Sequence, residues 1–195
     1  KQLVDLGISV WSFDYRGYGT STSSTIITTD YLNTKFLIDL KSVLGFALNN
    51  GSGQGVYLYG QNMGATLALS VGITNPQVLG ILADSPITSL DEFMSVATEH
   101  ALPYTRPQYW KDSYDPVSRI PLGATGRFQK GILIGGGLEL YPNGESVKSL
   151  ANLRPDKLSY TIVEGSLGTT NEAALGTDYL ELFKTLLNLK STPNP

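Results

Sequence analysis

The stretch Val56-Tyr-Leu-Tyr-Gly60-Gln-Asn62-Met-Gly64-Ala-Thr-Leu-Ala68 decides the fold. It begins as a short apolar run of strand length and continues as a run with helical character. Two glycines four residues apart bracket the junction, where the chain has to turn sharply. Side chains at such positions would clash with neighbouring backbone, so Gly60 and Gly64 fit a tight turn. The stretch therefore predicts a strand, a sharp turn centred on Asn62, and a helix.

The same alternation of strand and helix extends along the chain. Short, nearly continuous apolar runs are typical of strands that are buried on both faces, and they occur at residues 8–13, 56–59, 79–83, 132–134 and 159–163. Longer segments of helical period lie between them, at about residues 30–44, 64–74, 90–100, 144–153 and 171–189, with Thr29 or Asp30 as a cap for the first. This pattern predicts an α/β fold, with a mostly parallel sheet covered by helices on both faces.

The length of 195 residues fits one domain. We expect a single domain over residues 1–190 and a flexible tail over 191–195. Residues 101–126 lose their periodicity and are rich in Pro, Tyr, Trp and Arg. We interpret them as a small cap or an irregular insertion.

Composition excludes several classes of function. The net charge of −3 and the lack of a basic run argue against nucleic-acid binding. No apolar stretch approaches the roughly 18–20 residues that span a bilayer. The absence of cysteine excludes disulfides and thiolate chemistry, and a single histidine, His100, disfavours a multi-histidine metal site. We therefore expect no metal and no cofactor. A charged fraction of only 16% favours, weakly, a secreted or cell-surface protein.

Three segments in order resemble the α/β-hydrolase family, in particular members with a small cap. The first is Gly7-Ile-Ser-Val-Trp-Ser-Phe-Asp-Tyr-Arg-Gly-Tyr-Gly-Thr-Ser21, similar to the family's strand ending in D-x-R-G-x-G-x-S. The second is the strand–turn–helix stretch around Asn62, which resembles the nucleophile elbow. The third runs from Tyr114-Asp-Pro-Val117 to Ile132-Leu-Ile-Gly-Gly136 and resembles the approach to the acid-bearing strand.

The resemblance implies a degenerate catalytic triad. Asn62 stands where such a hydrolase has its nucleophilic serine, and the nitrogen lone pair of an amide is delocalised, so a base cannot activate it. The stretch Val163-Glu-Gly-Ser-Leu-Gly168-Thr-Thr-Asn171 corresponds to the turn that carries the family's histidine, and Gly168 occupies that position. Without an imidazole the site has no general base. Glu139 matches the acid position, with a solvated loop carboxylate as the equal alternative.

Other residues are weaker candidates. Gln61, Asn62 and Met63 would line a remaining cleft at the turn, where the backbone N–H of Met63 is a possible oxyanion donor. Asp84 follows a strand end, where ligands of open α/β sheets bind, although Asp84 or Ser85 capping a helix is slightly favoured. For His100, near a helix end, a surface or cap role is favoured over catalysis.

The resemblance also predicts a gap in the sheet. In the family, a strand that precedes Lys1 lies between the strands corresponding to residues 8–13 and 56–59. We therefore expect the N-terminal strands to be absent from this chain, and an upstream segment or a companion polypeptide to complete the sheet.

The leading functional hypothesis is a non-catalytic α/β-hydrolase-fold protein that serves as a binding, scaffolding or assembly subunit, with an unknown small-molecule ligand. The alternative is an esterase-like hydrolase with displaced or partner-supplied catalytic residues. A third possibility is a histidine-independent reaction that uses Asp84 and Glu139.

Overall fold

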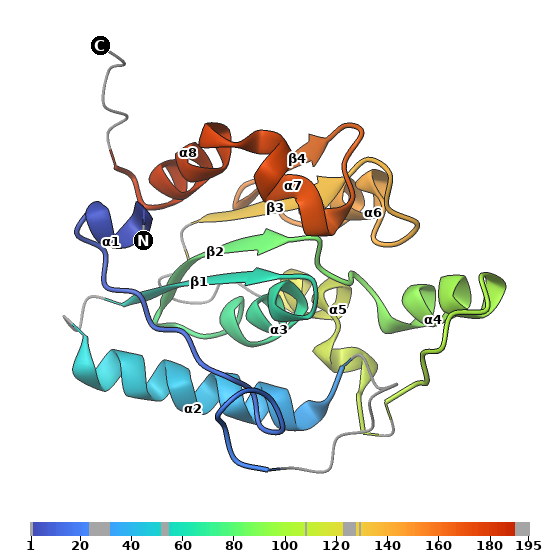
Figure 1. Ribbon diagram of the computed structural model, residues 1–195, viewed down its shortest axis with the longest axis horizontal. Helices are drawn as coiled ribbons and strands as arrows, with labels where there is room; N and C mark the ends of the chain where they lie inside the picture. Colours follow the sequence, from blue (N-terminus) through green and yellow to red (C-terminus); the bar gives the residue numbers. More distant parts are fainter. Residues whose placement is uncertain are drawn as a thin grey trace.

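A computed structural model describes residues 2–23, 32–51, 55–107, 109–122, 128 and 130–189 of the chain. Its centre is a parallel sheet in the order β1-β2-β3-β4 (Figure 1). The strands are β1 (Val56–Gln61), β2 (Val78–Asp84), β3 (Lys130–Gly136) and β4 (Leu158–Val163). Each matches an apolar run of the sequence, extended by one to four residues. The expected tail at 191–195 and the caps Thr29 and Asp30 lie outside the described residues.

Helices flank both faces of the sheet, as the sequence predicts (Figure 1). They are α1 (Gln2–Asp5), α2 (Thr34–Asn50), α3 (Met63–Gly72), α4 (Leu90–Glu99), α5 (Pro116–Leu122), α6 (Gly144–Ala151), α7 (Asn171–Leu175) and α8 (Thr177–Leu186), with short 3-10 turns η1 (Asp112–Tyr114) and η2 (Gly168–Thr170). Within the described residues α2 begins at Thr34, because the Asn33 side chain accepts a hydrogen bond from the N–H of Lys35.

Strand β2 divides the core into two clusters because successive side chains point to opposite faces of a sheet. Ile81 and Ala83 pack with residues of α2, α3 and α6, and with Ile120 of α5. Leu82 points the other way and packs with residues of α8. The parallel strands also bring their carboxyl ends to one edge of the sheet, where an α/β fold places its functional groups.

Residues 8–13 form no strand, contrary to the sequence prediction. Apolar character alone does not make a strand, because its backbone groups need a neighbour to pair with. Among the described residues, β1 pairs only with β2, and no backbone hydrogen bond joins residues 9–14 to another element. The segment instead packs against α2, with Trp11 at 5.3 Å from Phe46 between ring centroids.

Two further expectations need correction. The final helix is split, because Gly176 adopts a φ of 53° between α7 and α8. Helix α5 lies inside the segment expected to be irregular, with Pro116 at its first position, where the missing N–H costs nothing. Pro121 occurs within α5, which masked its helical period in the sequence.

Candidate functional site

The turn after β1 has the strained geometry of a nucleophile elbow. Asn62 adopts φ 49° and ψ −113°, a region that side chains other than glycine rarely enter. Its N–H donates to the carbonyl oxygen of Asp84 at 2.8 Å, and its carbonyl oxygen accepts from the N–H of Thr66 at 3.0 Å. The backbone of the turn is therefore tied both to β2 and to the first turn of α3.

Position 60 has to be glycine because the backbone at the start of α3 lies very close to it. A Cβ atom at position 60 would lie 2.5 Å from the nitrogen of Ala65 and closer still to the carbonyl group of Gly64. These are backbone atoms at the start of α3, so they cannot move aside cheaply. A Cβ at Gly64 would meet nothing within 4 Å. Of the two glycines that the sequence predicts for the turn, only Gly60 is therefore required by steric crowding.

Glu139 and Gly168, which the sequence analysis placed at the acid and histidine positions, lie in contact. The N–H of Gly168 donates to Oε1 of Glu139. Gly168 is buried, and a Cβ atom there would lie 2.6 Å from the Cβ of Ser85 and 2.7 Å from Oε1 of Glu139. Any larger side chain at position 168 would therefore displace Ser85 or Glu139.

Asp84 is fully buried beneath this edge. Its Oδ1 accepts from Nδ2 of Asn171 at 2.7 Å and from the hydroxyl of Ser85 at 3.1 Å, and its Oδ2 accepts from the hydroxyl of Tyr179 at 2.7 Å. A ligand in an open cleft cannot reach this carboxylate directly. Asp84 instead ties β2 to α7 and α8. Neither Asp84 nor Ser85 caps α4, because Ser89 holds that position.

The network around Asp84 was missed at the level of sequence. Asn171 and Tyr179 lie 87 and 95 residues away along the chain, and no spacing rule links them to Asp84. Ser85 adopts a φ of 53°, so two adjacent strands each end in a residue with positive φ. The one available signal was Asp84 itself, a charged residue that ends an apolar strand.

Loss of contact with water raises the pKa of both carboxyl groups. It raises the pKa of Asp84, against hydrogen bonds from Asn171, Tyr179, Ser85 and Gln61 that lower it. Burial also raises the pKa of Glu139, with a further upward contribution from the negative charge of Asp84 and a downward one from the N–H of Gly168. The two acids are therefore electrostatically coupled.

The remaining candidate residues lie at the turn. Gln61 is exposed at the end of β1, and its Nε2 donates to the hydroxyl of Tyr179 at 3.4 Å. Met63 is partly buried at the first position of α3 and packs against the larger core cluster. Gln61, Asn62 and Met63 are thus adjacent to one another and lie above the buried carboxylate of Asp84.

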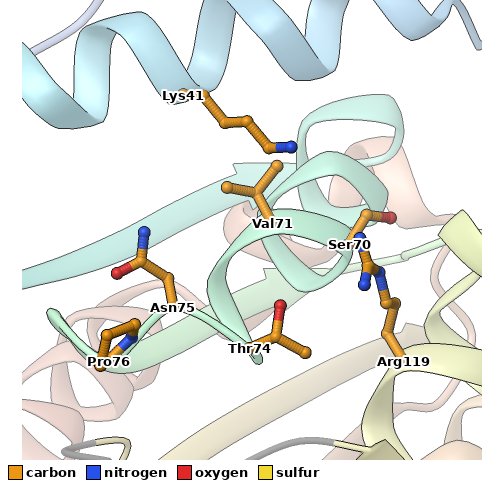
Figure 2. A pocket seen from close by; sticks show the side chains of 7 residues that line it. All are labelled: Lys41, Ser70, Val71, Thr74, Asn75, Pro76 and Arg119. Carbon is orange, nitrogen blue, oxygen red and sulfur yellow. The ribbon is translucent and has the colours of Figure 1, made fainter.

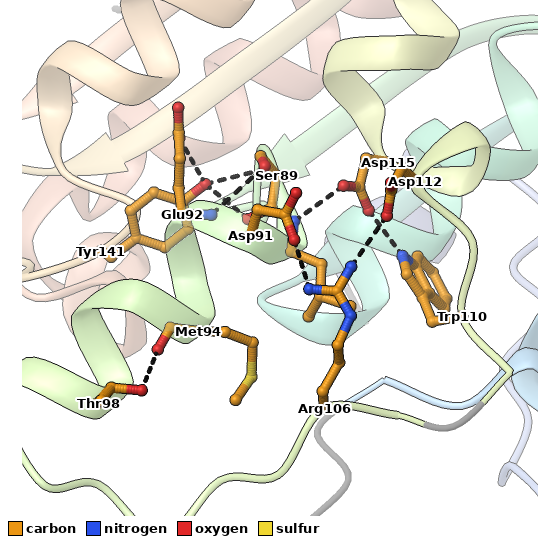
Figure 3. Close-up of polar contacts among 11 residues, drawn as sticks. Ser89, Asp91, Glu92, Met94, Thr98, Arg106, Trp110, Asp112, Asp115 and Tyr141 are labelled. Carbon is orange, nitrogen blue, oxygen red and sulfur yellow. Dashed lines mark hydrogen bonds and ion pairs between the residues drawn. The ribbon is translucent and has the colours of Figure 1, made fainter.

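The aromatic segment before α5 is fastened to α4 (Figure 3). Arg106 forms ion pairs with Asp91 and, at 2.9 Å, with Asp112. Oδ1 of Asp115 accepts from Nε1 of Trp110 at 2.6 Å, and Oδ2 accepts from the N–H of Leu90 at 2.9 Å. Trp110 is 6% exposed, so it belongs to the core and does not line a cleft.

A second polar cluster joins α4 to the loop before α6. The hydroxyl of Tyr141 donates to the carbonyl oxygen of Ser89 at 3.0 Å (Figure 3). The same hydroxyl contacts the hydroxyl of Thr88 at 2.5 Å. His100 is exposed at the C-terminal end of α4, away from this cluster.

The described residues contain neither a metal-ligating cluster nor a membrane-spanning helix. No group of three or more metal-ligating side chains occurs in that part of the chain. No helix within the described ranges is long and apolar enough to cross a membrane.

The parallel sheet with its flanking helices agrees with comparisons to known proteins. Residues 1–114, more than half of the chain, match the family model described as serine aminopeptidase S33. The chain belongs to this family. The serine aminopeptidase S33 match and the structural neighbours place it in the α/β-hydrolase superfamily, as the sequence motifs indicate.

Solved structures share the fold of this S33 family member. An esterase from Pyrococcus furiosus superposes with a TM-score of 0.72 at 17% identity, covering 95% of this chain and 72% of that chain. An alpha-beta serine hydrolase homologue from Coxiella burnetii gives 0.58 at 16% identity, covering 91% and 67%. A serine hydrolase without lid from Xanthomonas campestris gives 0.58 at 12% identity, covering 92% and 66%. No curated protein matches the sequence.

Proposed function

We propose that this protein is a non-catalytic member of the α/β-hydrolase superfamily that acts as a binding, scaffolding or assembly subunit. The observation that carries the proposal is the packing around Gly168. At the position aligned with the catalytic histidine, a Cβ atom would already lie 2.6 Å from Ser85, so an imidazole has no room there. Asn62, at the strained position of the elbow, supplies an amide where the chemistry needs a hydroxyl.

The alternative, an esterase-like hydrolase with displaced or partner-supplied catalytic groups, requires another nucleophile near the elbow. Ser85 is the candidate for this nucleophile, because it carries a hydroxyl that donates a hydrogen bond to the carboxylate of Asp84. It is only 1% exposed, however, and an ester carbonyl could not approach it without opening the turn. This burial favours the non-catalytic proposal.

Ester hydrolysis distinguishes the two proposals. We expect p-nitrophenyl acetate to be hydrolysed at the same rate by wild type, by N62A and by S85A, each at the level of a denatured sample. Saturable turnover by wild type that N62A abolishes would overturn the non-catalytic proposal. Loss in S85A alone, with the fold intact by circular dichroism, would assign the reaction to a displaced nucleophile.

We further propose that an additional strand, from an upstream segment or a companion polypeptide, completes the sheet beside β1. The outer edge of β1 has no paired strand among the described residues, and its Tyr59 is 46% exposed. In the segment that forms no strand, Val10 and Trp11 are 53% and 48% exposed. An open strand edge with large apolar side chains is suited to pairing with another strand.

The subunit composition of the native material tests this second proposal. We expect mass spectrometry under native and denaturing conditions to find an added segment or a companion chain, with slow amide exchange over residues 56–61. A lone species of 21.0 kDa with rapid exchange at β1 would contradict it.

A further inference from the structure

A pocket separate from the elbow lies between α2, the end of α3 and α5 (Figure 2). Its volume is about 220 Å³, and it is lined by Lys41, Ser70, Val71, Thr74, Asn75, Pro76 and Arg119. Asn62 precedes the N-terminal end of α3, whereas Ser70 lies near the other end of that helix. At 1.5 Å per residue, about 12 Å of helix separates the two sites.

Arg119 differs from the other arginines that the structure describes. Arg16 pairs with Asp39, Arg106 with Asp91 and Asp112, and Arg154 with Asp156. Arg119 has no carboxylate partner within the described residues. Its Nε is buried and makes no hydrogen bond there. The Arg119 side chain also lines the pocket, so an acceptor bound there would meet the other N–H donors of its guanidinium.

A second cation reaches the same pocket from α2. Figure 2 shows the side chain of Lys41 extending from α2 toward Val71, opposite Arg119. Lys41 has no ion-pair partner in the described part of the chain, and no acidic residue lines the pocket. The two positive charges are therefore not neutralised by the lining.

The polar side chains complete a donor-rich lining. Oδ1 of Asn75 accepts from the N–H of Gln77 at 2.9 Å, which leaves the NH₂ group of Asn75 as a donor. Thr74 contributes a hydroxyl. Ser70 donates its proton to the carbonyl oxygen of Thr66 at 2.7 Å, so it adds no donor to the pocket. Val71 and Pro76 add a small apolar surface.

We propose that this pocket binds a small phosphate monoester, held by Arg119 and Lys41. Two cations match the charge of roughly −1.5 to −2 that a monoester carries at neutral pH. The guanidinium fork fits phosphate oxygens in a bidentate way, and Lys41 serves as a point charge. The volume lies below the roughly 300–1,000 Å³ of sites for drug-sized ligands, so the organic group is small and rests on Val71 and Pro76. The site does not depend on the function of the elbow.

Titration with phenyl phosphate tests the proposal. At constant ionic strength, with sodium chloride as the reference, we expect saturable ¹⁵N–¹H shifts at the backbone amides of residues 70–75. R119M should weaken binding about tenfold or more, because it removes charge-assisted hydrogen bonds. K41Q should weaken it about threefold. K35Q is the matched control, because it removes the same charge from the same helix outside the pocket.

Three outcomes would overturn the proposal. They are the absence of saturable shifts up to about 50 mM ligand, shifts that cluster away from residues 70–75, or equal weakening by K35Q and K41Q. K41Q keeps the test valid if R119M does not fold, because Lys41 is exposed on α2.

Discussion

The turn at Asn62 and the turn at Gly168 follow two strands of the same parallel sheet, but their central residues differ in exposure and in packing. Asn62 is partly exposed, at positive φ, on a turn fixed by backbone contacts. Gly168 is buried against Ser85 and Glu139, with no space for a side chain. The comparison teaches that the first turn keeps a strained backbone with asparagine at its centre, whereas the second turn leaves no space for a side chain at position 168.

The largest effect is expected at the backbone contact of the elbow. G60A places a Cβ against the carbonyl group of Gly64, and we expect a loss of about 3 kcal/mol in the free energy of unfolding. G64A is the matched control, because its Cβ meets nothing within 4 Å and alanine favours the helix by up to about 1 kcal/mol. Urea unfolding of both variants measures the difference. Equal losses would refute the close approach at Gly60.

The strain at Asn62 is the next expected effect. N62V should destabilise the protein by about 2 kcal/mol, because a β-branched side chain tolerates positive φ poorly. N62G relieves the strain but also increases the conformational entropy of the unfolded chain. Because the two effects oppose each other, its free energy of unfolding should stay within about 1 kcal/mol of wild type. Thermal and urea unfolding compare the two variants. A valine variant as stable as the glycine variant would mean that the turn relaxes to negative φ.

The packing at the second turn should have a smaller, rescuable effect. G168A should cost about 1–2 kcal/mol, because its Cβ overlaps Ser85. S85G removes the overlapping atoms and suits the φ of 53° at that position. A double-mutant cycle of G168A and S85G should therefore show a favourable coupling of about 1 kcal/mol. Strict additivity would show that the two residues do not touch.

The smallest expected effect is a pH dependence of the free energy of unfolding that comes from the carboxyl group of Asp84. Burial raises the pKa of Asp84 above the ordinary value of about 3.9. The folded state then binds the proton more tightly than the unfolded state, so stability falls as pH rises from about 4 through the folded pKa. D84N cannot lose a proton there, and its stability should fall less between pH 4 and 7. Urea midpoints at several pH values measure this. An unchanged slope in D84N would assign the dependence to other groups, such as Glu139 or Asp115, whose pKa values burial also raises.

Local patterns were sufficient for much of this architecture. The four strands of the sheet coincide with apolar runs, because strands buried on both faces have no polar side to interrupt them. The glycine pair at 60 and 64 predicted the elbow, because steric exclusion at a sharp turn is a property of neighbouring residues. The sequence analysis named Glu139 and Gly168 together, and the structure places them in hydrogen-bond contact, although their assignment to an acid and a base stays a prediction.

Other features could not be read locally. Residues 8–13 have the composition of a strand, but their state depends on a partner that the described part of the chain lacks. The prolines of α5 obscured a helix that tertiary packing of Ile120 stabilises. The sequence proposed Asp84 as a binding residue, but it did not reveal the burial of Asp84 or its hydrogen bonds to Asn171 and Tyr179.

The sequence by itself determined the α/β class, the elbow and the family, because these depend on short-range periodicity, on glycine sterics and on motifs of consecutive residues. Tertiary structure alone decided that position 168 is closed by Ser85, that Asp84 is buried beneath the elbow, and that Lys41 and Arg119 meet in one pocket. Each of these depends on side chains brought together from distant elements. Such closeness follows from how the helices and the sheet pack, and no spacing along the chain encodes it.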